Sequence, residues 1–272
     1  MVLDRLLQAN IKKCQFFVDR LEFLGHIISG QGLSPCPGKI DTISNANPPN
    51  NVTELKAFLG LVNFYGKFVP NLSAKLSCFY DLLKKDTKFC WDSICQRQFE
   101  KCKTYLLKTD VLEFFDPKKP LIVVTDTCSY GLGGVLSHEV NGQERPICFT
   151  SFTLNDAQRK YPILHLEALA VVSCVKKIHR YLYGQHFVIY TDHKPLLGVY
   201  GKEGSNAILV TRLQRYINEL SIYSFNIHYR PSNQMGNADF CFRFPLPNKV
   251  PRNLDRSYVN SLNFSNELPL DF

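Results

Sequence analysis

Two short segments of the sequence decide the fold class: residues 121–126 read LIVVTD, and residues 187–192 read FVIYTD. Each segment is a run of apolar, mostly β-branched or aromatic residues, which predicts a buried strand. Each run ends in Thr-Asp, so each strand is expected to carry a carboxylate to the edge of a sheet, where ligands gather in α/β proteins. The two segments therefore predict an α/β fold with a candidate site at the ends of its strands.

The sequence around these strands predicts the rest of a sheet. Residues 132–140 and 146–152 are expected to form a hairpin, because the Asn141-Gly142 pair between them favours a two-residue turn. The other elements expected here are, in chain order, a helix from Pro162 to about Tyr183 that ends at Gly184, helices at 195–200 and 209–220, a strand at 224–229 and a short helix at 237–242. We therefore expect residues 119–243 to form an α/β domain: a five-stranded mixed sheet with flanking helices.

The segment before residue 119 has a helical period instead. Asn51 is expected to cap a helix, with Glu54 three residues later completing a capping box, and Pro70 is expected to end it. The apolar residues that fall on one face of this helix are Leu55, Phe58, Leu59, Val62 and Tyr65. This pattern predicts a helix that packs against a core.

Further helices and a pair of strands complete this half of the chain. An apolar stripe at residues 72–83 and another helix capped by Ser93 predict a small helical module. Before it, residues 16–18 and 23–28 are expected to form two short strands. The domain boundaries expected from these changes of pattern are 1–45 for a strand hairpin, 46–118 for the helical module, 119–245 for the α/β domain and 246–272 for a tail.

Four carboxylates are candidates for chemistry at the predicted sheet edge: Asp126, Glu167, Asp192 and Asp239. Asp126 and Asp192 end the two strands, whereas Glu167 lies in an apolar helix, where an unpaired carboxylate is costly and needs a partner. Such a cluster of oxygens suits Mg²⁺ or Mn²⁺, and two such ions stabilise the attacking and leaving oxygens of phosphodiester cleavage. The alternative is that each aspartate only caps the turn or helix that follows its strand.

Composition narrows the class of partner and the compartment. The 272 residues carry 32 Lys and Arg against 24 Asp and Glu, a net charge of +8 that favours a polyanionic partner such as nucleic acid. We find no apolar run long enough to cross a bilayer and no signal peptide, so we expect no membrane partner, a cytoplasmic or nuclear location and ten reduced cysteines. Four histidines, His138, His165, His179 and His193, lack metal-ligand spacing and are expected to be structural or surface residues. A functional role stays open for His193 alone, because it is adjacent to Asp192.

Several motifs occur in the order found in one family. The motifs are FLGHIIS at residues 23–29, ELKAFLGLVNFYGKFVPN at 54–71, TD at 125–126, EALAVV at 167–172, YTDHKPL at 190–196, RLQR at 212–215, YRP at 229–231 and NAD at 237–239. Together they resemble the thumb and RNase H domain of the reverse transcriptase of gypsy-class LTR retrotransposon polyproteins. The resemblance covers about residues 10–247.

The resemblance implies an RNase H-type endonuclease that cleaves the RNA strand of RNA–DNA hybrids with two Mg²⁺ or Mn²⁺ ions. The catalytic metal ligands that it implies are Asp126, Glu167, Asp192 and Asp239. The residues that it places in contact with nucleic acid are Gly25, His26, Asn63, Tyr65, Lys67, Arg212 and Arg215. It also implies a palm remnant at residues 1–45, a thumb-like module at 46–118, and the remainder of a reverse transcriptase polyprotein as a partner.

The chain departs from the family pattern in places that leave alternatives open. No Tyr-x-Asp-Asp motif occurs, so polymerase activity is not expected. Asp239 is followed by Phe240 and Phe242, where the family has Ala and Ser, and Phe152 stands where the family usually has Arg. The alternatives to an active nuclease are a catalytically dead nucleic-acid-binding remnant and a host-retained interaction protein.

Overall fold

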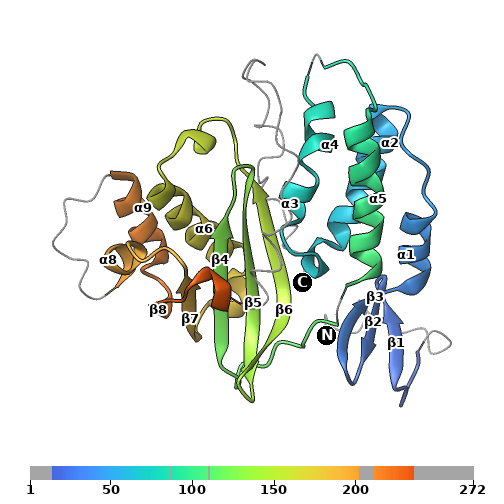
Figure 1. Cartoon of the computed structure of the whole chain (residues 1–272). Helices are drawn as coiled ribbons and strands as arrows, with labels where there is room; N and C mark the ends of the chain where they lie inside the picture. The colour runs from blue at the N-terminus through green and yellow to red at the C-terminus, as the bar shows by residue number, and fades with distance from the viewer. Residues whose placement is uncertain (1–13, 86, 110, 202–210, 236–272) are drawn as a thin grey trace, which may run out of the picture.

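The computed structural model of the chain describes residues 14–85, 87–109, 111–201 and 211–235, and a five-stranded mixed sheet is its central feature (Figure 1). The strands, in chain order, are β4 (Leu121–Thr127), β5 (Gly131–Val140), β6 (Gln143–Thr153), β7 (His186–Thr191) and β8 (Ser224–Tyr229). Their order across the sheet is β6-β5-β4-β7-β8. β5 pairs antiparallel with β4 and β6, whereas β7 pairs parallel with β4 and β8. The predicted five-stranded mixed sheet is confirmed.

The β5–β6 hairpin forms around the predicted Asn-Gly turn. Asn141 and Gly142 have φ values of 54° and 74°, and a type I′ turn requires positive φ at both of its central residues. β4 is the central strand, and its residues Val123 and Val124 are fully buried. The carboxylate that follows these residues therefore begins from a rigid, fully paired strand.

Helices cover the sheet on the side that carries the candidate site. α6 (Ile163–Lys177) packs against β4 and β5, and α9 (Thr211–Leu220) packs against α6. The long helix expected up to Tyr183 is divided, because Ile178 has φ −103° and ψ 20° and separates α6 from the short α7 (His179–Leu182). α8 (Leu196–Tyr200) and the 3₁₀ turns η4 (Gln158–Lys160) and η6 (Ser232–Gln234) complete this part. The helix expected at 237–242 lies outside the described residues.

A second group of helices precedes the sheet. Its elements are α1 (Pro37–Ser44), α2 (Val52–Phe64), η3 (Gly66–Phe68), α3 (Leu72–Lys75), α4 (Ser77–Leu82) and α5 (Ser93–Leu107). The predicted cap of α2 is confirmed, because Asn51 Oδ1 accepts a hydrogen bond from the Glu54 N–H at 2.9 Å. The five apolar residues expected on one face of α2 are all buried in the core of this module.

Two predicted ends of these helices are wrong by a few residues. α2 ends at Phe64 rather than near Pro70, since the chain tightens into the 3₁₀ turn η3. The cap of α5 is Asp92 rather than Ser93: Asp92 Oδ1 accepts a hydrogen bond from the Cys95 N–H at 2.7 Å. Both residue types cap helices well, so the sequence alone does not separate two adjacent candidates.

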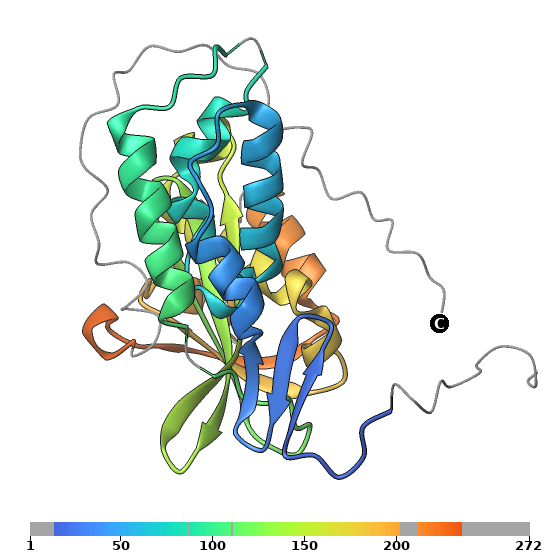
Figure 2. The ribbon, with the colours of Figure 1, turned by 90° about the vertical axis from the view of Figure 1, so that its right-hand side faces the viewer.

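A small antiparallel sheet, drawn in blue, lies below α1 in Figure 2. Its strands are β1 (Arg20–Phe23), β2 (His26–Ser29) and β3 (Gly32–Pro35). The strands predicted at 16–18 and 23–28 are therefore wrong in position: residues 16–18 form no strand, and the second segment is divided by a turn. Leu24 and Gly25 of that turn have φ values of 47° and 75°, which end β1 and reverse the chain into β2.

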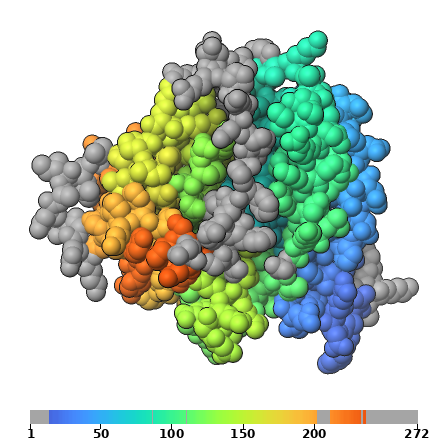
Figure 3. Space-filling model, viewed as in Figure 1, coloured from blue at the N-terminus to red at the C-terminus, as the bar shows by residue number. Residues whose placement is uncertain are grey.

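The helical module lies directly against β6, the edge strand of the large sheet. The Ser73 N–H donates a hydrogen bond to Ser151 Oγ at 3.1 Å, and Phe149 of β6 packs on the core of the module. A Cβ atom at Gly131 would lie 2.9 Å from Ser73 Oγ, so glycine allows this close approach. Figure 3 shows the helical module on the right, in blue to green, beside the sheet and its helices on the left, in yellow-green to red. The predicted domain boundaries stay predictions.

Candidate active site

Three of the four predicted acids meet at one end of the large sheet. In the parallel pairing of β4 and β7, Val124 lies opposite Tyr190, and Asp126 and Asp192 each follow two residues later. The register therefore brings both carboxylates to the same level, and α6, which packs on β4, adds Glu167. One carboxylate oxygen from each residue lies within 4.8 Å of those of the other two. The predicted convergence of these three acids is what the register produces.

Hydrogen bonds from neighbouring groups hold all three carboxylates. Asp126 Oδ1 accepts a hydrogen bond from the Thr127 N–H at 2.6 Å, and Glu167 Oε1 accepts one from the Thr127 hydroxyl at 2.5 Å. Asp192 Oδ2 accepts a hydrogen bond from the Ser232 hydroxyl at 2.7 Å. Sequence reasoning missed both hydroxyl residues; the position of Thr127 directly after a candidate acid was the available signal.

The electrostatics of the site centre on Glu167. This side chain is only 4% exposed, and burial, reinforced by the negative charges of Asp126 and Asp192, raises its pKa to about 8. The hydrogen bond from Thr127 acts in the opposite direction but does not offset the loss of water. An ionised carboxylate in this position is therefore stable only when a positive charge lies beside it.

The donor set fits a divalent metal ion. Glu167 Oε2 is buried and has no hydrogen-bond partner within the described part of the chain, although a buried carboxylate oxygen normally has one. Three carboxylates supply the hard oxygen ligands that Mg²⁺ and Mn²⁺ prefer. A cation among Asp126, Glu167 and Asp192 would both satisfy the orphaned oxygen and cancel the mutual repulsion. The fourth predicted ligand, Asp239, lies outside the described residues, as do Phe240 and Phe242.

Four of the seven residues predicted to contact nucleic acid, Gly25, His26, Tyr65 and Lys67, lie together where the β1–β2 turn meets the end of α2. The Tyr65 hydroxyl donates a hydrogen bond to the Gly25 carbonyl at 2.8 Å, and the rings of His26 and Tyr65 lie 5.7 Å apart. Tyr65 is fully buried, so in this structure it acts on the surface only by holding the turn. Asn63 is exposed, whereas Lys67 is half-buried and burial lowers its pKa.

Arg212 and Arg215 lie apart from that group, on α9. The Arg212 guanidinium stacks 3.7 Å from the centre of the Tyr161 ring and donates a hydrogen bond to His165 Nδ1 at 3.1 Å. His165 belongs to α6, the helix that carries Glu167. These contacts therefore hold the Arg212 side chain against the N-terminal part of α6, two residues before Glu167. Arg215 is exposed and pairs with Glu219 at 3.6 Å.

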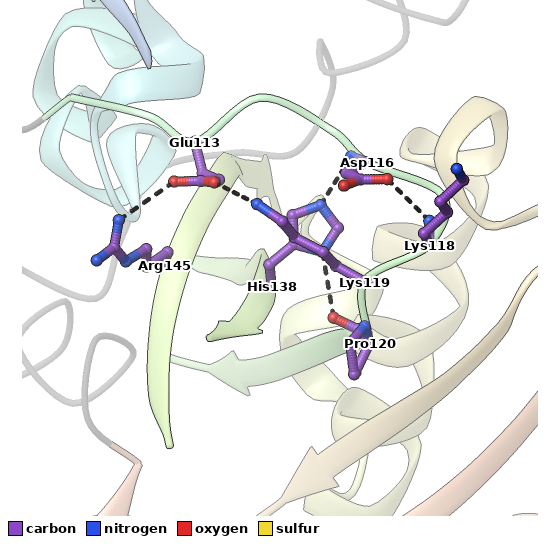
Figure 4. Close-up of polar contacts among 7 residues, drawn as sticks. All are labelled: Glu113, Asp116, Lys118, Lys119, Pro120, His138 and Arg145. Atoms are coloured by element: carbon purple, nitrogen blue, oxygen red, sulfur yellow. Dashed lines mark hydrogen bonds and ion pairs between the residues drawn. The ribbon is translucent and has the colours of Figure 1, made fainter. Parts of the chain in front are cut away.

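His138 confirms the expectation of a structural histidine (Figure 4). It is fully buried, and its Nε2 accepts a hydrogen bond from the Asp116 N–H at 2.9 Å. Its Nδ1 donates to the Pro120 carbonyl at 3.1 Å, which fixes the neutral tautomer. The Glu113 carboxylate beside it pairs with Lys119 at 2.8 Å. These contacts hold residues 113–120, the segment before β4, against β5.

The mixed sheet, with acids at the ends of two parallel strands and on the helix between them, defines an RNase H-like fold. Residues 91–189 match the family model described as the RNase H-like domain found in reverse transcriptase. The chain is homologous to part of the Pol polyproteins of LTR retrotransposons, as the resemblance indicated.

Two relatives illustrate the extent of this homology. The chain is 34% identical over 251 residues to the retrovirus-related Pol polyprotein from transposon 297 of Drosophila melanogaster, covering 90% of this chain and 23% of the relative. It is 32% identical over 277 residues to the transposon Tf2-3 polyprotein of Schizosaccharomyces pombe, covering 99% of this chain and 20% of the relative. The chain thus spans a quarter or less of the length of these relatives.

A solved structure supports the fold independently. The foamy viral protease-reverse transcriptase, solved in complex with an RNA/DNA hybrid, superposes with a TM-score of 0.68 at 22% identity, over 91% of this chain and 33% of the viral one. At this identity the likeness concerns the fold. Among the described residues, no helix has the length and apolar character needed to span a membrane.

Proposed function

We propose that this chain is the RNase H-type endonuclease part of a retrotransposon reverse transcriptase and cleaves the RNA strand of RNA–DNA hybrids. The observation that carries the proposal is the convergence of three carboxylates within 4.8 Å around a buried, partly unsatisfied Glu167. Such a cluster has no structural use without a cation, because it costs stability through burial and repulsion. A caps-only role for Asp126 and Asp192 does not account for it.

The metal ligands in this proposal are Asp126, Glu167 and Asp192, with Asp239 as the fourth. When bound, two Mg²⁺ or Mn²⁺ ions would stabilise the attacking and leaving oxygens of the phosphodiester. Hydrolysis would form a bond from water oxygen to phosphorus and break the bond to the 3′ oxygen, leaving a 3′-hydroxyl and a 5′-phosphate. Asp126 and Asp192 are half-exposed, so the open side of the site faces the substrate.

Other parts of the chain orient the metal ligands and favour the proposed substrate. Thr127 links two of the acids, since its N–H binds Asp126 and its hydroxyl binds Glu167. The net charge of +8 favours a polyanionic substrate. The foamy viral relative in fold was solved with an RNA/DNA hybrid, which supports a hybrid as the substrate class. The remainder of a Pol polyprotein is the proposed partner, with no polymerase activity in this chain.

A cleavage assay on an end-labelled RNA–DNA hybrid with Mg²⁺ tests the proposal. Asp192→Asn keeps the shape but removes a negative charge, so cleavage is expected to fall by several orders of magnitude while the fold survives. Asp41→Asn, at an exposed position on α1, is the matched control and should cleave normally. Hybrid binding without cleavage by the unmodified chain would favour the dead binding remnant. Absence of both would favour the host-retained interaction protein.

A further inference from the structure

We propose that Ser232 is a positioning residue for the metal site: its hydroxyl holds Asp192 and ties this carboxylate to the segment that follows β8. The inference rests on the proposed function and extends it to a residue that neither the motifs nor the charge pattern indicated. It concerns a contact between two parts of the chain that are 40 residues apart.

The contact has the geometry of a strong hydrogen bond. The distance of 2.7 Å from Ser232 Oγ to Asp192 Oδ2 is typical of a hydroxyl that donates to an ionised carboxylate. The bond engages Oδ2, so it orients the carboxylate and leaves Oδ1 for other partners. Asp192 needs such a restraint because it is half-exposed and lies within 4.8 Å of the carboxylate oxygens of Asp126 and Glu167, with which it must share one site.

The hydroxyl itself is held in place by the backbone on both sides. Before it, the Arg230 N–H donates to the Thr191 carbonyl at 2.9 Å and extends the pairing of β7 with β8. After it, the Met235 N–H donates to the Ser232 carbonyl at 3.2 Å and closes the 3₁₀ turn η6. Met235 is only 3% exposed and packs on the sheet beside Val124 and neighbouring apolar residues. Ser232 therefore stands on an anchored loop.

The source of the donor distinguishes Asp192 from the other acids. Asp126 and Glu167 are both held by Thr127, which belongs to the same strand as Asp126. Asp192 is held from the opposite side, by the loop after β8. The position of the Asp192 carboxylate thus depends on whether the loop after β8 packs on the sheet, because the Ser232 hydroxyl of this loop binds that carboxylate.

The test compares an isosteric pair, Ser232→Thr and Ser232→Val, in the full chain. Threonine keeps the hydroxyl and valine replaces it with a methyl group. Mg²⁺ affinity is measured by calorimetry without nucleic acid, and kcat and KM by hybrid cleavage. We expect Val to weaken Mg²⁺ binding roughly ten-fold and to lower kcat with KM for the hybrid unchanged, as for other residues that orient metal ligands. Thr should restore both to within about two-fold of the unmodified chain.

Ser221→Ala is the matched control, because the Ser221 hydroxyl donates to the Asn218 carbonyl at 2.8 Å at the end of α9. It should change neither Mg²⁺ affinity nor kcat. The metal-free Tm of each variant reports the fold, and Ser232→Ala serves as a second variant if Val lowers it. Equal Mg²⁺ affinity and kcat in Thr, Val and unmodified chains would overturn the role of Ser232 alone. An unmodified chain that neither binds Mg²⁺ nor cleaves would overturn the proposed function as well.

Discussion

Replacing Glu167 by glutamine is expected to stabilise the metal-free protein at neutral and alkaline pH while abolishing its response to Mg²⁺. Glu167 has its pKa raised from 4.5 to about 8, so the folded state holds this proton more tightly than the unfolded state. The stability linked to this proton is complete below pH 4.5 and is lost as the pH rises from there through 8. Glutamine has no charge to bury and avoids this loss.

The magnitude follows from the pH interval. At about 1.4 kcal/mol for each pH unit above the ordinary pKa, the unmodified fold loses on the order of 3 kcal/mol by pH 7. For a chain of this size, roughly 2–4 °C per kcal/mol gives a Tm of Glu167→Gln about 6–12 °C above that of the unmodified chain at pH 7. At pH 5 the difference should shrink to about 1–3 °C, because this pH lies only half a unit above the ordinary pKa of 4.5.

The assay is thermal unfolding followed by circular dichroism between pH 5 and 8.5, with EDTA or with Mg²⁺. Mg²⁺ should raise the Tm of the unmodified chain increasingly as the pH rises, because the ion competes with the proton on Glu167. It should leave Glu167→Gln unchanged. Glu139→Gln, at an exposed position on β5, is the control and should follow the unmodified chain. A Tm difference that does not depend on pH, or a less stable Glu167→Gln at pH 8, would refute the reasoning.

Three further predictions concern the rest of the chain. Asn51→Ala removes the cap of α2 and should cost about 1 kcal/mol of unfolding free energy in a urea titration, whereas the adjacent Asn50→Ala should cost less. His138→Phe leaves the Asp116 N–H without its acceptor and should cost roughly 1–3 kcal/mol in the same titration; an unchanged midpoint would contradict the structural role. Hybrid affinity, followed by fluorescence anisotropy, should fall steeply between roughly 50 and 200 mM salt. Lys67→Glu should lower it alike for all hybrid sequences, and salt-insensitive binding would argue for a protein partner.

The large sheet was predictable because its strands are continuous apolar runs with clear ends. The LIVVTD and FVIYTD segments became neighbouring parallel strands, and their shared Thr-Asp ends placed Asp126 and Asp192 together. The Asn141-Gly142 turn was equally predictable from the sequence, since few residue pairs adopt positive φ at both positions. Strong local preferences and the tertiary fold agree in these places.

The errors fall where two local signals compete or where tertiary contacts decide. Residues 16–18 are apolar enough for a strand, but pairing begins only at Arg20, and Phe16 and Phe17 stay exposed. Tyr65 belongs to a motif associated with nucleic-acid contact, yet its ring completes the core of the helical module. The apolar period of α2 had already placed Tyr65 on the buried face, so the periodicity and the structure agree on the burial of this residue.

The donors to the acids were missed for a related reason. Serine and threonine are frequent and have many roles in proteins, so a hydroxyl residue in a sequence does not by itself predict a contact with a carboxylate. Ser232 becomes meaningful only when the β7–β8 pairing brings its loop beside Asp192. The acids were recognisable because burying a carboxylate is costly, whereas exposing a hydroxyl costs little.

The contact between the helical module and β6 has a consequence for how this protein can be divided. An uncovered edge strand exposes unpaired backbone groups and invites strand-to-strand aggregation. Here the Glu113 N–H occupies the Pro146 carbonyl at 2.7 Å, and the core of the helical module covers Phe149. A recombinant fragment that begins at residue 119 would lose both the hydrogen bond from Glu113 and the packing of the helical module on Phe149. A soluble nuclease fragment should therefore retain the helices that precede the sheet.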